Sequence, residues 1–359
     1  MAKSGEFLAV YNMNKELLKE MLAQEYVMVQ KHPNADLYIY NYTRKAQFER
    51  LWNEITLLTR GLILDGEMNI VARPFIKFFN YEEHTPEQIP ALPFELYEKM
   101  DGSLGILYWL NGKPYIASRG SFESDQAKHA NKVLYERYQH TFEKLNKGAT
   151  YLFEIIYPEN RIVCDYFGKD DLVLLAVIDN TTGNDLPLEE IGFEVVKRYD
   201  GFTDLEKVRD VQDSNREGYI AKFINGFRVK MKFEEYCRLH SIVTNVSNVI
   251  VWEHLRDGKS FDELLDRTPD EFDQFIKKTV QELTDRFNEV HERAMLEHRE
   301  VMLQNFSSRK EMAEYVFKNC TNSKLVFSLM DGKDISRNIW PLVRPKWCKP
   351  FINNSDDDL

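Results

Sequence analysis

Short apolar runs separated by turn residues fill the first two-thirds of the chain, a pattern that is typical of strands. Residues 104–110 and 115–118 predict two strands joined by Asn111-Gly112, a dipeptide that strongly favours a β-hairpin. Residues 151–157 and 172–178 are further apolar runs of strand length. The pattern therefore predicts antiparallel sheet structure in this region.

A second hairpin is predicted at residues 219–233, with Asn225-Gly226 at its turn. Apolar and charged residues alternate completely along its second strand, so four apolar side chains share one face and three cations share the other. The apolar residues are Phe227, Val229, Met231 and Phe233, and the cations are Arg228, Lys230 and Lys232.

After about residue 245 the pattern becomes helical. Residues 260–263 and 268–271 each match a capping box, and apolar residues recur every three or four positions from 270 to 305. Residues 353–358 are polar and acidic and are expected to form a frayed tail. The expected fold class is α+β, with a mixed domain at 1–245 and an all-helical domain at 246–359.

Length, composition and charge argue against several classes of protein but do not identify a function. A chain of 359 residues is expected to form two domains. No apolar run is long enough to span a membrane and the N-terminus lacks a signal-peptide pattern, so a cytoplasmic protein is expected. The four cysteines show no paired spacing, which supports neither a disulfide framework nor a thiolate zinc site. A net charge of −11 argues against loose, charge-driven binding of nucleic acid.

The segment Glu98-Lys99-Met100-Asp101-Gly102-Ser103 precedes a predicted strand and carries the main candidate chemistry. A lysine amine attacks a phosphorus atom only in its neutral form, which is scarce at pH 7, so a nucleophilic lysine needs a site that removes its charge. The Asp-Gly pair allows a tight turn beside the lysine. The alternative is an ordinary turn with a solvated lysine, which this short segment by itself favours.

The three cations of the predicted strand 227–233 make a nucleophilic role for Lys99 more plausible. Three like charges in a row repel one another unless an anion lies over them, and a polyphosphate is the natural candidate. The same cations would help to keep Lys99 neutral. The alternative is a solvated edge strand, on which lysines are common.

Three acidic residues are candidates for a metal site. Glu154 lies within the apolar run 151–157, and Glu217 opens the second hairpin. A carboxylate among apolar residues has either a partner or a function. Together with Asp101, these residues would suit a hydrated Mg²⁺ or Mn²⁺ ion, whereas the alternative for Glu154 is a buried salt bridge.

Cations and tyrosines further upstream add candidates for phosphate binding. Arg60 precedes an apolar run, and Lys77 lies within another. Arginine forks and lysine point charges are both common phosphate ligands. Tyr38, Tyr40 and Tyr42 alternate along one predicted strand and are expected to share a face, where packing is the ordinary role of such an array.

In chain order, these segments resemble the motif series of the lysine-dependent nucleotidyltransferases, and more closely that of the phage RNA ligase 1 family, which repairs cut tRNA anticodon loops. The resemblance covers about residues 36–241, and its specific signal is the order of the motifs. The segments that carry it are Tyr40-Asn-Tyr42, Arg60-Gly-Leu-Ile, 72–80, Lys99–Ser103, Ser118-Arg-Gly-Ser121, Phe153-Glu154, 160–163, 216–221, Lys230-Met-Lys232, Tyr236 and 239–241.

The resemblance implies an ATP-dependent RNA ligase with a nucleotidyltransferase domain (the ATP-grasp-like adenylyltransferase of ligases) and no OB domain. Lys99 would become covalently adenylylated, and Lys230 and Lys232 would contact the α-phosphate of ATP. Glu154 and Glu217 would lie near the nucleotide and a hydrated catalytic metal. The other implied ATP-site positions are Tyr40, Arg60 and Lys77 at the β and γ phosphates, and Phe79, Asp101, Gly102, Ser103, Arg119, Gly218 and Tyr236 elsewhere.

One position departs from the family pattern. The family generally places lysine where this chain has Arg119, so a point contact there is expected to be altered by the wider, planar guanidinium. The implied partner is RNA, in particular a tRNA with a broken anticodon loop. The implied setting is a monomer in the cytoplasm, or in the host cytoplasm if the chain is phage-encoded.

Two other functions remain as alternatives. DNA ligases and capping guanylyltransferases typically place arginine two residues after the Asp-Gly and follow the lysine-rich strand with an OB domain. This chain has Ser103-Leu104 at the first place and a helical pattern at the second, which favours RNA. An inactive RNA-binding scaffold is the other alternative, but it predicts missing catalytic residues, and all candidates are present.

The C-terminal region carries a local excess of positive charge. Residues 309–349 contain nine lysines or arginines against four acids, and Trp340 or Trp347 would be available to stack on a base. The alternative is ordinary surface charge with tryptophans in a core. No Walker-type loop is present, so repair of RNA end chemistry by this chain is not expected.

Overall fold

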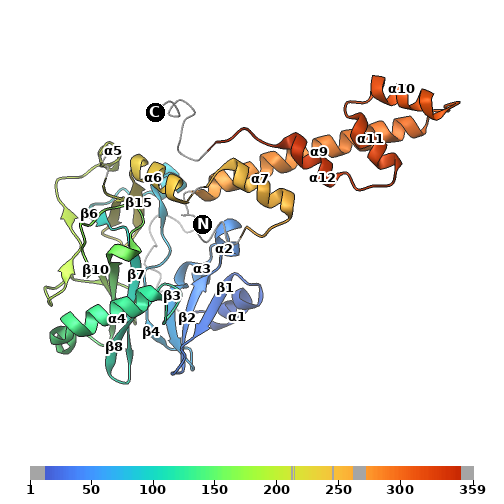
Figure 1. The fold of residues 1–359 in the computed structure, drawn as a ribbon. Helices are drawn as coiled ribbons and strands as arrows, with labels where there is room; N and C mark the ends of the chain where they lie inside the picture. Colours follow the sequence, from blue (N-terminus) through green and yellow to red (C-terminus); the bar gives the residue numbers. More distant parts are fainter. Residues whose placement is uncertain (1–12, 212, 214, 245, 262–271, 349–359) are drawn as a thin grey trace. The chain divides into compact units, whose positions relative to one another are not determined.

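The computed structural model describes residues 13–348 except 212, 214, 245 and 262–271 (Figure 1). It divides the chain into two compact units, Met1–Val243 and Thr244–Leu359. The first unit combines helices with largely antiparallel sheets, and the described residues of the second unit form helices and loops. The expected α+β class with helices at the C-terminal side is therefore confirmed.

Some predictions fall on parts of the chain that the structure does not describe. The capping box at 268–271, the second half of the box at 260–263 and the predicted tail at 353–358 all lie outside the described residues.

The first sheet has four antiparallel strands in the order β1-β2-β3-β4. Helix α1 begins after Asn14, whose side chain accepts a hydrogen bond from the backbone N–H of Leu17. Apolar side chains of α1 and α3, such as Leu18 and Ile55, cover one face of this sheet. The bounds are α1 Lys15–Ala23, β1 Val27–Lys31, β2 Leu37–Tyr42, α2 Arg44–Phe48, α3 Glu54–Leu58, β3 Arg60–Asp65 and β4 Ile70–Ala72.

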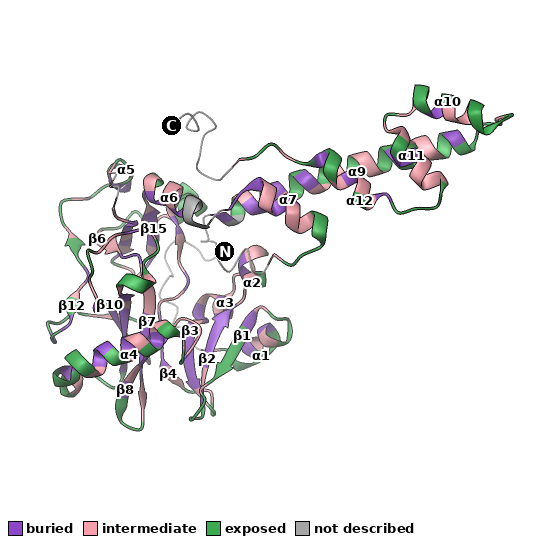
Figure 2. Cartoon of the chain, viewed as in Figure 1, coloured by how far each residue is buried: buried purple, intermediate pink, exposed green. Residues whose placement is uncertain are grey.

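The second sheet runs in the order β11-β10-β9-β7-β8, and β12 pairs with β10 in parallel. Strand β9 is buried along almost its whole length, as is β2 of the first sheet, which is drawn largely in purple in Figure 2. Phe153 and Ile155 pack under helix α4, whereas Leu152 packs on the opposite face, which Glu154 shares by alternation. The bounds are β7 Ser103–Leu110, β8 Lys113–Ser118, α4 Asp125–Arg137, β9 Ala149–Ile156, β10 Asp171–Asp179, β11 Asp185–Leu186 and β12 Glu194–Val195.

The third sheet runs in the order β13-β6-β14-β15-β5, with β5 parallel to β15. One face forms an apolar core that contains Leu96, Tyr219 and Val229. By alternation, Lys99 and the cations of β15 lie on the other face. The bounds are β5 Phe79–Asn80, β6 Phe94–Lys99, β13 Arg198–Tyr199, α5 Leu205–Arg209, β14 Gly218–Phe223, β15 Arg228–Lys232 and α6 Glu234–Thr244.

Both predicted hairpins are confirmed, with different turns. Between β7 and β8, Asn111 and Gly112 have φ angles of 52° and 77°, the two left-handed positions of a type I′ turn. Between β14 and β15, the N–H of Gly226 donates to the carbonyl of Phe223 at 2.9 Å. There only Gly226 of the two turn residues has a positive φ, of 82°, which is typical of a longer connection.

The second unit forms its own apolar core. Helix α9 is 30 residues long and contributes Ala294, which is buried with Leu325 and Ile339. Trp340 packs against Phe287 at a ring-centre distance of 4.6 Å, whereas Trp347 is 45% exposed. No helix in the described part of the chain is apolar over a membrane-spanning length. The bounds are α7 Asn248–Asp257, α9 Asp273–Met302, α10 Arg309–Asn319, α11 Ser323–Met330 and α12 Ser336–Ile339.

We expect Gly218→Ala to destabilise the protein by about 2–4 kcal/mol. Gly218 has φ of 145°, and a Cβ atom there would lie 2.1 Å from the carbonyl oxygen of Met231. Urea unfolding of both proteins measures the change. Gly120→Ala is the matched control, because a Cβ atom at 120 would meet nothing within 4 Å. Equal stability of the Gly218 variant and the control would contradict the expectation.

Candidate active site

Lys99 ends β6 at a point where three strands meet side by side. Its backbone lies opposite Gly218 on β14, and Gly218 lies opposite Lys232 on β15. The Lys99 ammonium is 2.5 Å from Glu217 Oε2, and the Lys232 ammonium is 2.8 Å from Glu217 Oε1. The Glu217 side chain is 4% exposed, so one buried carboxylate joins the two lysines.

The alternation along β15 is as predicted, but the partners of its cations are not. Arg228 forms an ion pair with Asp185, and Lys232 forms one with Glu217. Lys230 is 9% exposed. Carboxylates of the protein thus offset charge at Arg228 and Lys232, so repulsion along this strand does not by itself require a bound anion, and phosphate binding by Lys230 and Lys232 stays a prediction. The apolar face is confirmed, with Phe227, Val229, Met231 and Phe233 in one core.

Asp101 holds the turn after the lysine through hydrogen bonds to its carboxylate. Asp101 Oδ2 accepts from the backbone N–H groups of Val163 and Cys164, both at 2.9 Å. Asp101 Oδ1 accepts from the hydroxyl of Tyr236 at 2.8 Å, and the Asp101 N–H donates to the Tyr166 hydroxyl at 2.7 Å. Asp101 is 3% exposed, so these four contacts take the place of water.

Glu154 approaches the same turn from β9. Its Oε1 accepts a hydrogen bond from the backbone N–H of Gly102 at 2.9 Å. Burial, with a smaller contribution from the carboxylates of Glu217 and Asp101, raises the pKa of Glu154 to about 8, although Lys99 acts in the opposite direction. Glu154 is therefore mostly protonated at neutral pH in the free protein.

Gly102 and Ser103 are tied closely to the end of β9. A Cβ atom at position 102 would lie 2.7 Å from the carbonyl oxygen of Ile155 and from the side chain of Ile156, so glycine is needed for close approach. Ser103 Oγ accepts a hydrogen bond from the Asn160 side-chain amide at 3.0 Å. These contacts fix the backbone that follows the lysine.

Lys77 lies among aromatic rings. Its ammonium is 5.3 Å from the ring centres of Tyr42 and Trp52 and 5.4 Å from that of Phe79. Lys77 is 5% exposed, so cation–π attraction operates here with little water. The Arg119 guanidinium lies 5.8 Å from the same Tyr42 ring. Tyr42 thus contacts both cations.

The other upstream candidates are more dispersed. A Cβ atom on Gly61, the neighbour of Arg60, would lie 3.0 Å from the carbonyl oxygen of Arg119, so these two arginines belong to adjacent backbone segments. Tyr40 is 8% exposed and packs in the apolar cluster that includes Leu18 of α1. The structure supports packing for Tyr40, and its role at ATP phosphates stays a prediction, as does that of Arg60.

The predicted metal ligands form no ready metal site. Among the residues that the structure describes, no group of three His, Cys, Asp or Glu side chains is arranged to hold an ion. Glu217 takes part in two ion pairs, and both oxygens of Asp101 accept hydrogen bonds from the protein. The metal role of these residues and of Glu154 stays a prediction.

Several residues in and around the site had no role in the sequence argument. Tyr166 and Asn160 contact the turn after Lys99, and Asp185 pairs with Arg228. The only sequence signal was that Asn160 lies in one of the family-like segments. No sequence pattern pointed to Trp52 as a neighbour of Lys77. Their contact arises only when the α2–α3 loop folds against the segment before β5.

The chain is similar to known RNA ligases. Residues 58–236 match the family described as RNA ligase. The chain is 28% identical over 255 residues to a Thermovibrio ammonificans protein named "Putative RNA ligase", covering 66% of each. It is 25% identical over 343 residues to an RNA ligase of Rhodothermus phage RM378, covering 73% of this chain and 76% of the relative.

A solved structure, the Naegleria gruberi RNA ligase with PPi, is also similar in part. It shows 20% identity and a TM-score of 0.34, over 42% of this chain and 52% of the other. The matched part is thus 66% of the Thermovibrio protein and about half of the Naegleria chain. The family match confirms the resemblance to phage RNA ligase 1, and residues 58–236 belong to that RNA ligase family.

We expect Glu154→Gln to stabilise the free protein increasingly as the pH rises from 5 to 9. The folded protein holds the Glu154 proton up to about pH 8, whereas the unfolded chain releases it near the ordinary value of 4.5. Wild-type stability is therefore lost as the pH rises through this range, and the amide does not titrate. Urea unfolding at each pH measures the difference.

The exposed Glu159→Gln is the matched control, since it removes the same charge outside the site. Its stability relative to the wild type should stay nearly constant with pH. Parallel pH curves for Glu154→Gln and Glu159→Gln would contradict the expectation.

Proposed function

We propose that this chain is an ATP-dependent RNA ligase that joins RNA 5′-phosphate and 3′-hydroxyl ends through a lysyl-AMP on Lys99. The observation that carries the proposal is the pair of contacts from Lys99 and Lys232 to the single carboxylate of Glu217. A nucleophilic lysine needs a nearby group that takes its proton and cations that offset the negative charge of the phosphate. The site provides both.

In the first step, Lys99 Nζ attacks the α-phosphorus of ATP. The N–P bond forms, the bond from the α-phosphorus to the bridging oxygen breaks, and pyrophosphate leaves. Glu217 Oε2, 2.5 Å from Nζ, is placed to accept the lysine proton. Lys232 and Lys230, next to each other on the cationic face of β15, offset charge on the phosphate oxygens.

In the second and third steps, AMP passes to the RNA and is then displaced. An oxygen of the RNA 5′-phosphate attacks the phosphorus of lysyl-AMP, the N–P bond breaks, and the Lys99 amine regains a proton. The RNA 3′-hydroxyl then attacks the activated 5′-phosphate, and AMP leaves with the bonding electrons. The enzyme returns to its starting state, and one phosphodiester bond has formed.

A divalent cation fits Glu154 better than Asp101. Glu154 Oε1 accepts one backbone hydrogen bond, and Oε2 makes none within the described residues. Its raised pKa marks a carboxylate that gains stability as an anion when positive charge arrives. A bound Mg²⁺ or Mn²⁺ ion would offset charge on the triphosphate. Asp101 instead acts as a positioning residue, since its oxygens are already occupied.

The substrate is proposed to be a broken tRNA, on the strength of the family resemblance. The upstream group of Lys77, Phe79 and Arg119 would hold the β and γ phosphates. Strand β5 pairs directly with β15, which connects this group to Lys230 through the backbone. The exposed Trp347 and the positive charge of the second unit are available for RNA contact.

We expect wild-type protein incubated with magnesium and α-labelled ATP to retain the label, and Lys99→Ala to retain none. Lys113→Ala, which removes an exposed lysine on β8, should label like the wild type. A panel of acceptors then tests the substrate, and broken RNA should be sealed in preference to nicked DNA. An unlabelled wild type, equal labelling of Lys99→Ala, or preference for GTP or nicked DNA would reject the proposal.

We expect Glu217→Gln to slow lysyl-AMP formation at pH 7 by about 10²–10⁴-fold. The amide keeps the shape of the side chain but cannot accept the lysine proton. The defect should shrink as the pH rises, because solvent then takes the proton. Rapid-quench measurement of the labelled intermediate from pH 6 to 9 checks this, with Glu159→Gln as a charge-matched control. A rate within two-fold of the wild type at every pH would exclude Glu217 as the proton acceptor.

A further inference from the structure

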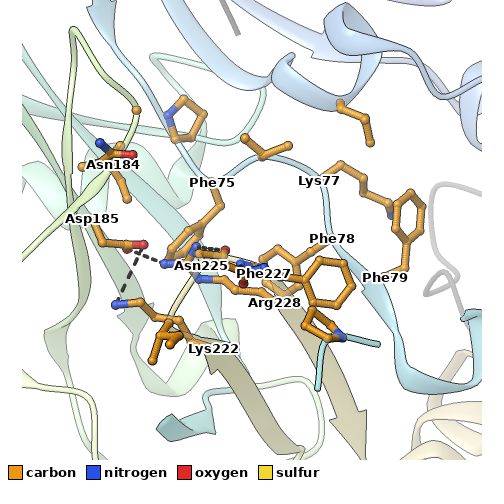
Figure 3. Close-up of a pocket in the computed structure, with 18 of the residues that line it drawn as sticks. Phe75, Lys77, Phe78, Phe79, Asn184, Asp185, Lys222, Asn225, Phe227 and Arg228 are labelled. Carbon is orange, nitrogen blue, oxygen red and sulfur yellow. Dashed lines mark hydrogen bonds and ion pairs between the residues drawn. The ribbon is translucent and has the colours of Figure 1, made fainter. Parts of the chain in front are cut away.

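A cavity of about 510 Å³ opens in the first unit (Figure 3). It lies between the segment 73–79, the turn of the second hairpin and the short loop before β11. Lys77 and Phe79, proposed above to hold the β and γ phosphates, are also among its lining residues, whereas Lys99, Glu154 and Glu217 are not. Its lining includes the aromatic residues Phe75 and Phe78 and the polar residues Asn184, Asp185, Lys222 and Arg228.

Aromatic rings form the apolar walls of this cavity. Phe75, Phe78 and Phe227 converge on it from two chain segments (Figure 3). The rings of Phe75 and Phe78 are 6.0 Å apart at an interplanar angle of 86°, and the Arg228 guanidinium lies 5.0 Å from the centre of the Phe75 ring. A cavity of a few hundred Å³ with aromatic walls suits a planar ring that stacks.

A mixed polar cluster lies at one end of the cavity. Arg228 is paired with Asp185, and the Lys222 ammonium is 3.8 Å from the same carboxylate. Because Asp185 offsets positive charge, the cluster presents donors and acceptors together instead of a bare cation. The Asn184 carboxamide has no hydrogen-bond partner among the described residues. Such an edge matches the donor and acceptor pattern of a nucleobase better than that of a free phosphate.

The cavity lies on the same sheet face as the reacting lysine. Arg228 and Lys232 are four residues apart on β15, and Lys222 and Gly218 are four residues apart on β14. Even spacing keeps side chains on one face, and four residues correspond to about 13 Å along a strand. Roughly four stacked nucleotides cover this distance at 3.4 Å each.

We propose that this cavity binds one unpaired nucleobase of the RNA substrate, a few nucleotides from the end that reacts at Lys99. The proposal rests on the proposed RNA ligase function. Phe75 stacks on the base, the nearly perpendicular ring of Phe78 contacts it edge to face, and Asn184 and Asp185 hydrogen-bond its polar edge. The occupant is an unpaired base because a base held in a duplex cannot leave its stack to enter a pocket without breaking its pair.

Photo-crosslinking of the full chain tests where the base lies. RNA substrates carry a single 5-iodouridine at successive positions from the reacting end, and crosslinked peptides are identified by mass spectrometry. We expect one position, a few nucleotides from the end, to crosslink to the peptides that contain Phe75 or Phe227. Crosslinks that avoid these peptides at every position would overturn the proposal.

Sealing kinetics test what the aromatic wall does. Phe75→Leu keeps the apolar volume but removes the aromatic face, so the KM for RNA should rise about ten-fold, and the KM for ATP should change less. Asn184→Ala, an exposed substitution that leaves the core intact, should also raise the KM for RNA. Phe167→Leu is the matched control, since Phe167 is 87% exposed outside the site, and it should change neither constant.

The outcomes separate the two proposals. If the wild type forms lysyl-AMP and seals RNA while Phe75→Leu and Asn184→Ala keep the wild-type KM for RNA, the base site is rejected and the ligase function stands. A larger effect of Phe75→Leu on the KM for ATP assigns the cavity to the nucleotide and also rejects the base site. If the wild type forms no lysyl-AMP, the ligase function fails, and the crosslinks alone decide whether RNA enters the cavity.

Discussion

The contact of one buried carboxylate, Glu217, with two lysines is the interaction on which the candidate site depends. Lys99 comes from β6 and Lys232 from β15, and only the strand between them, β14, brings the two ammonium groups to the same acceptor. At 4% exposure, Glu217 without these lysines would be a buried, unpaired charge, which is strongly unfavourable. The pairing therefore holds the ends of β6, β14 and β15 in register. It also brings together a carboxylate and the cations that attack of a lysine on a phosphorus atom needs.

Around this contact, the protein uses its own groups in place of solvent. The Asp101 carboxylate accepts hydrogen bonds from the backbone N–H groups of residues 163 and 164 and from the hydroxyl of Tyr236. These bonds join the turn after Lys99 to the loop at 163–164 and to helix α6. Gly102 allows β9 to approach within contact of the turn, which brings Glu154 to the site. Burial then raises the pKa of Glu154, so the site in its free state is one carboxylate charge less negative than its composition implies.

Local patterns predicted much of the fold. The hairpin turns follow from Asn-Gly pairs, the strand faces of 227–233 from strict alternation, and helix α9 from spacing of three and four residues. The partners were not predictable in the same way. Asp185 lies 43 residues before Arg228, and Trp52 lies 25 residues before Lys77, and no periodicity links residues at such separations.

The sequence by itself determined the elements, the alternation of β15 and the ordered motif residues, because these depend on chemistry and spacing within a few positions. Only the tertiary structure decided which charges meet. It placed Asp185 rather than an external anion at Arg228, made Asp101 a hydrogen-bond acceptor for the protein itself, and packed Tyr40 in an apolar cluster. The physical reason is that desolvation and pairing are set by what packs beside a group, and those neighbours come from distant parts of the chain.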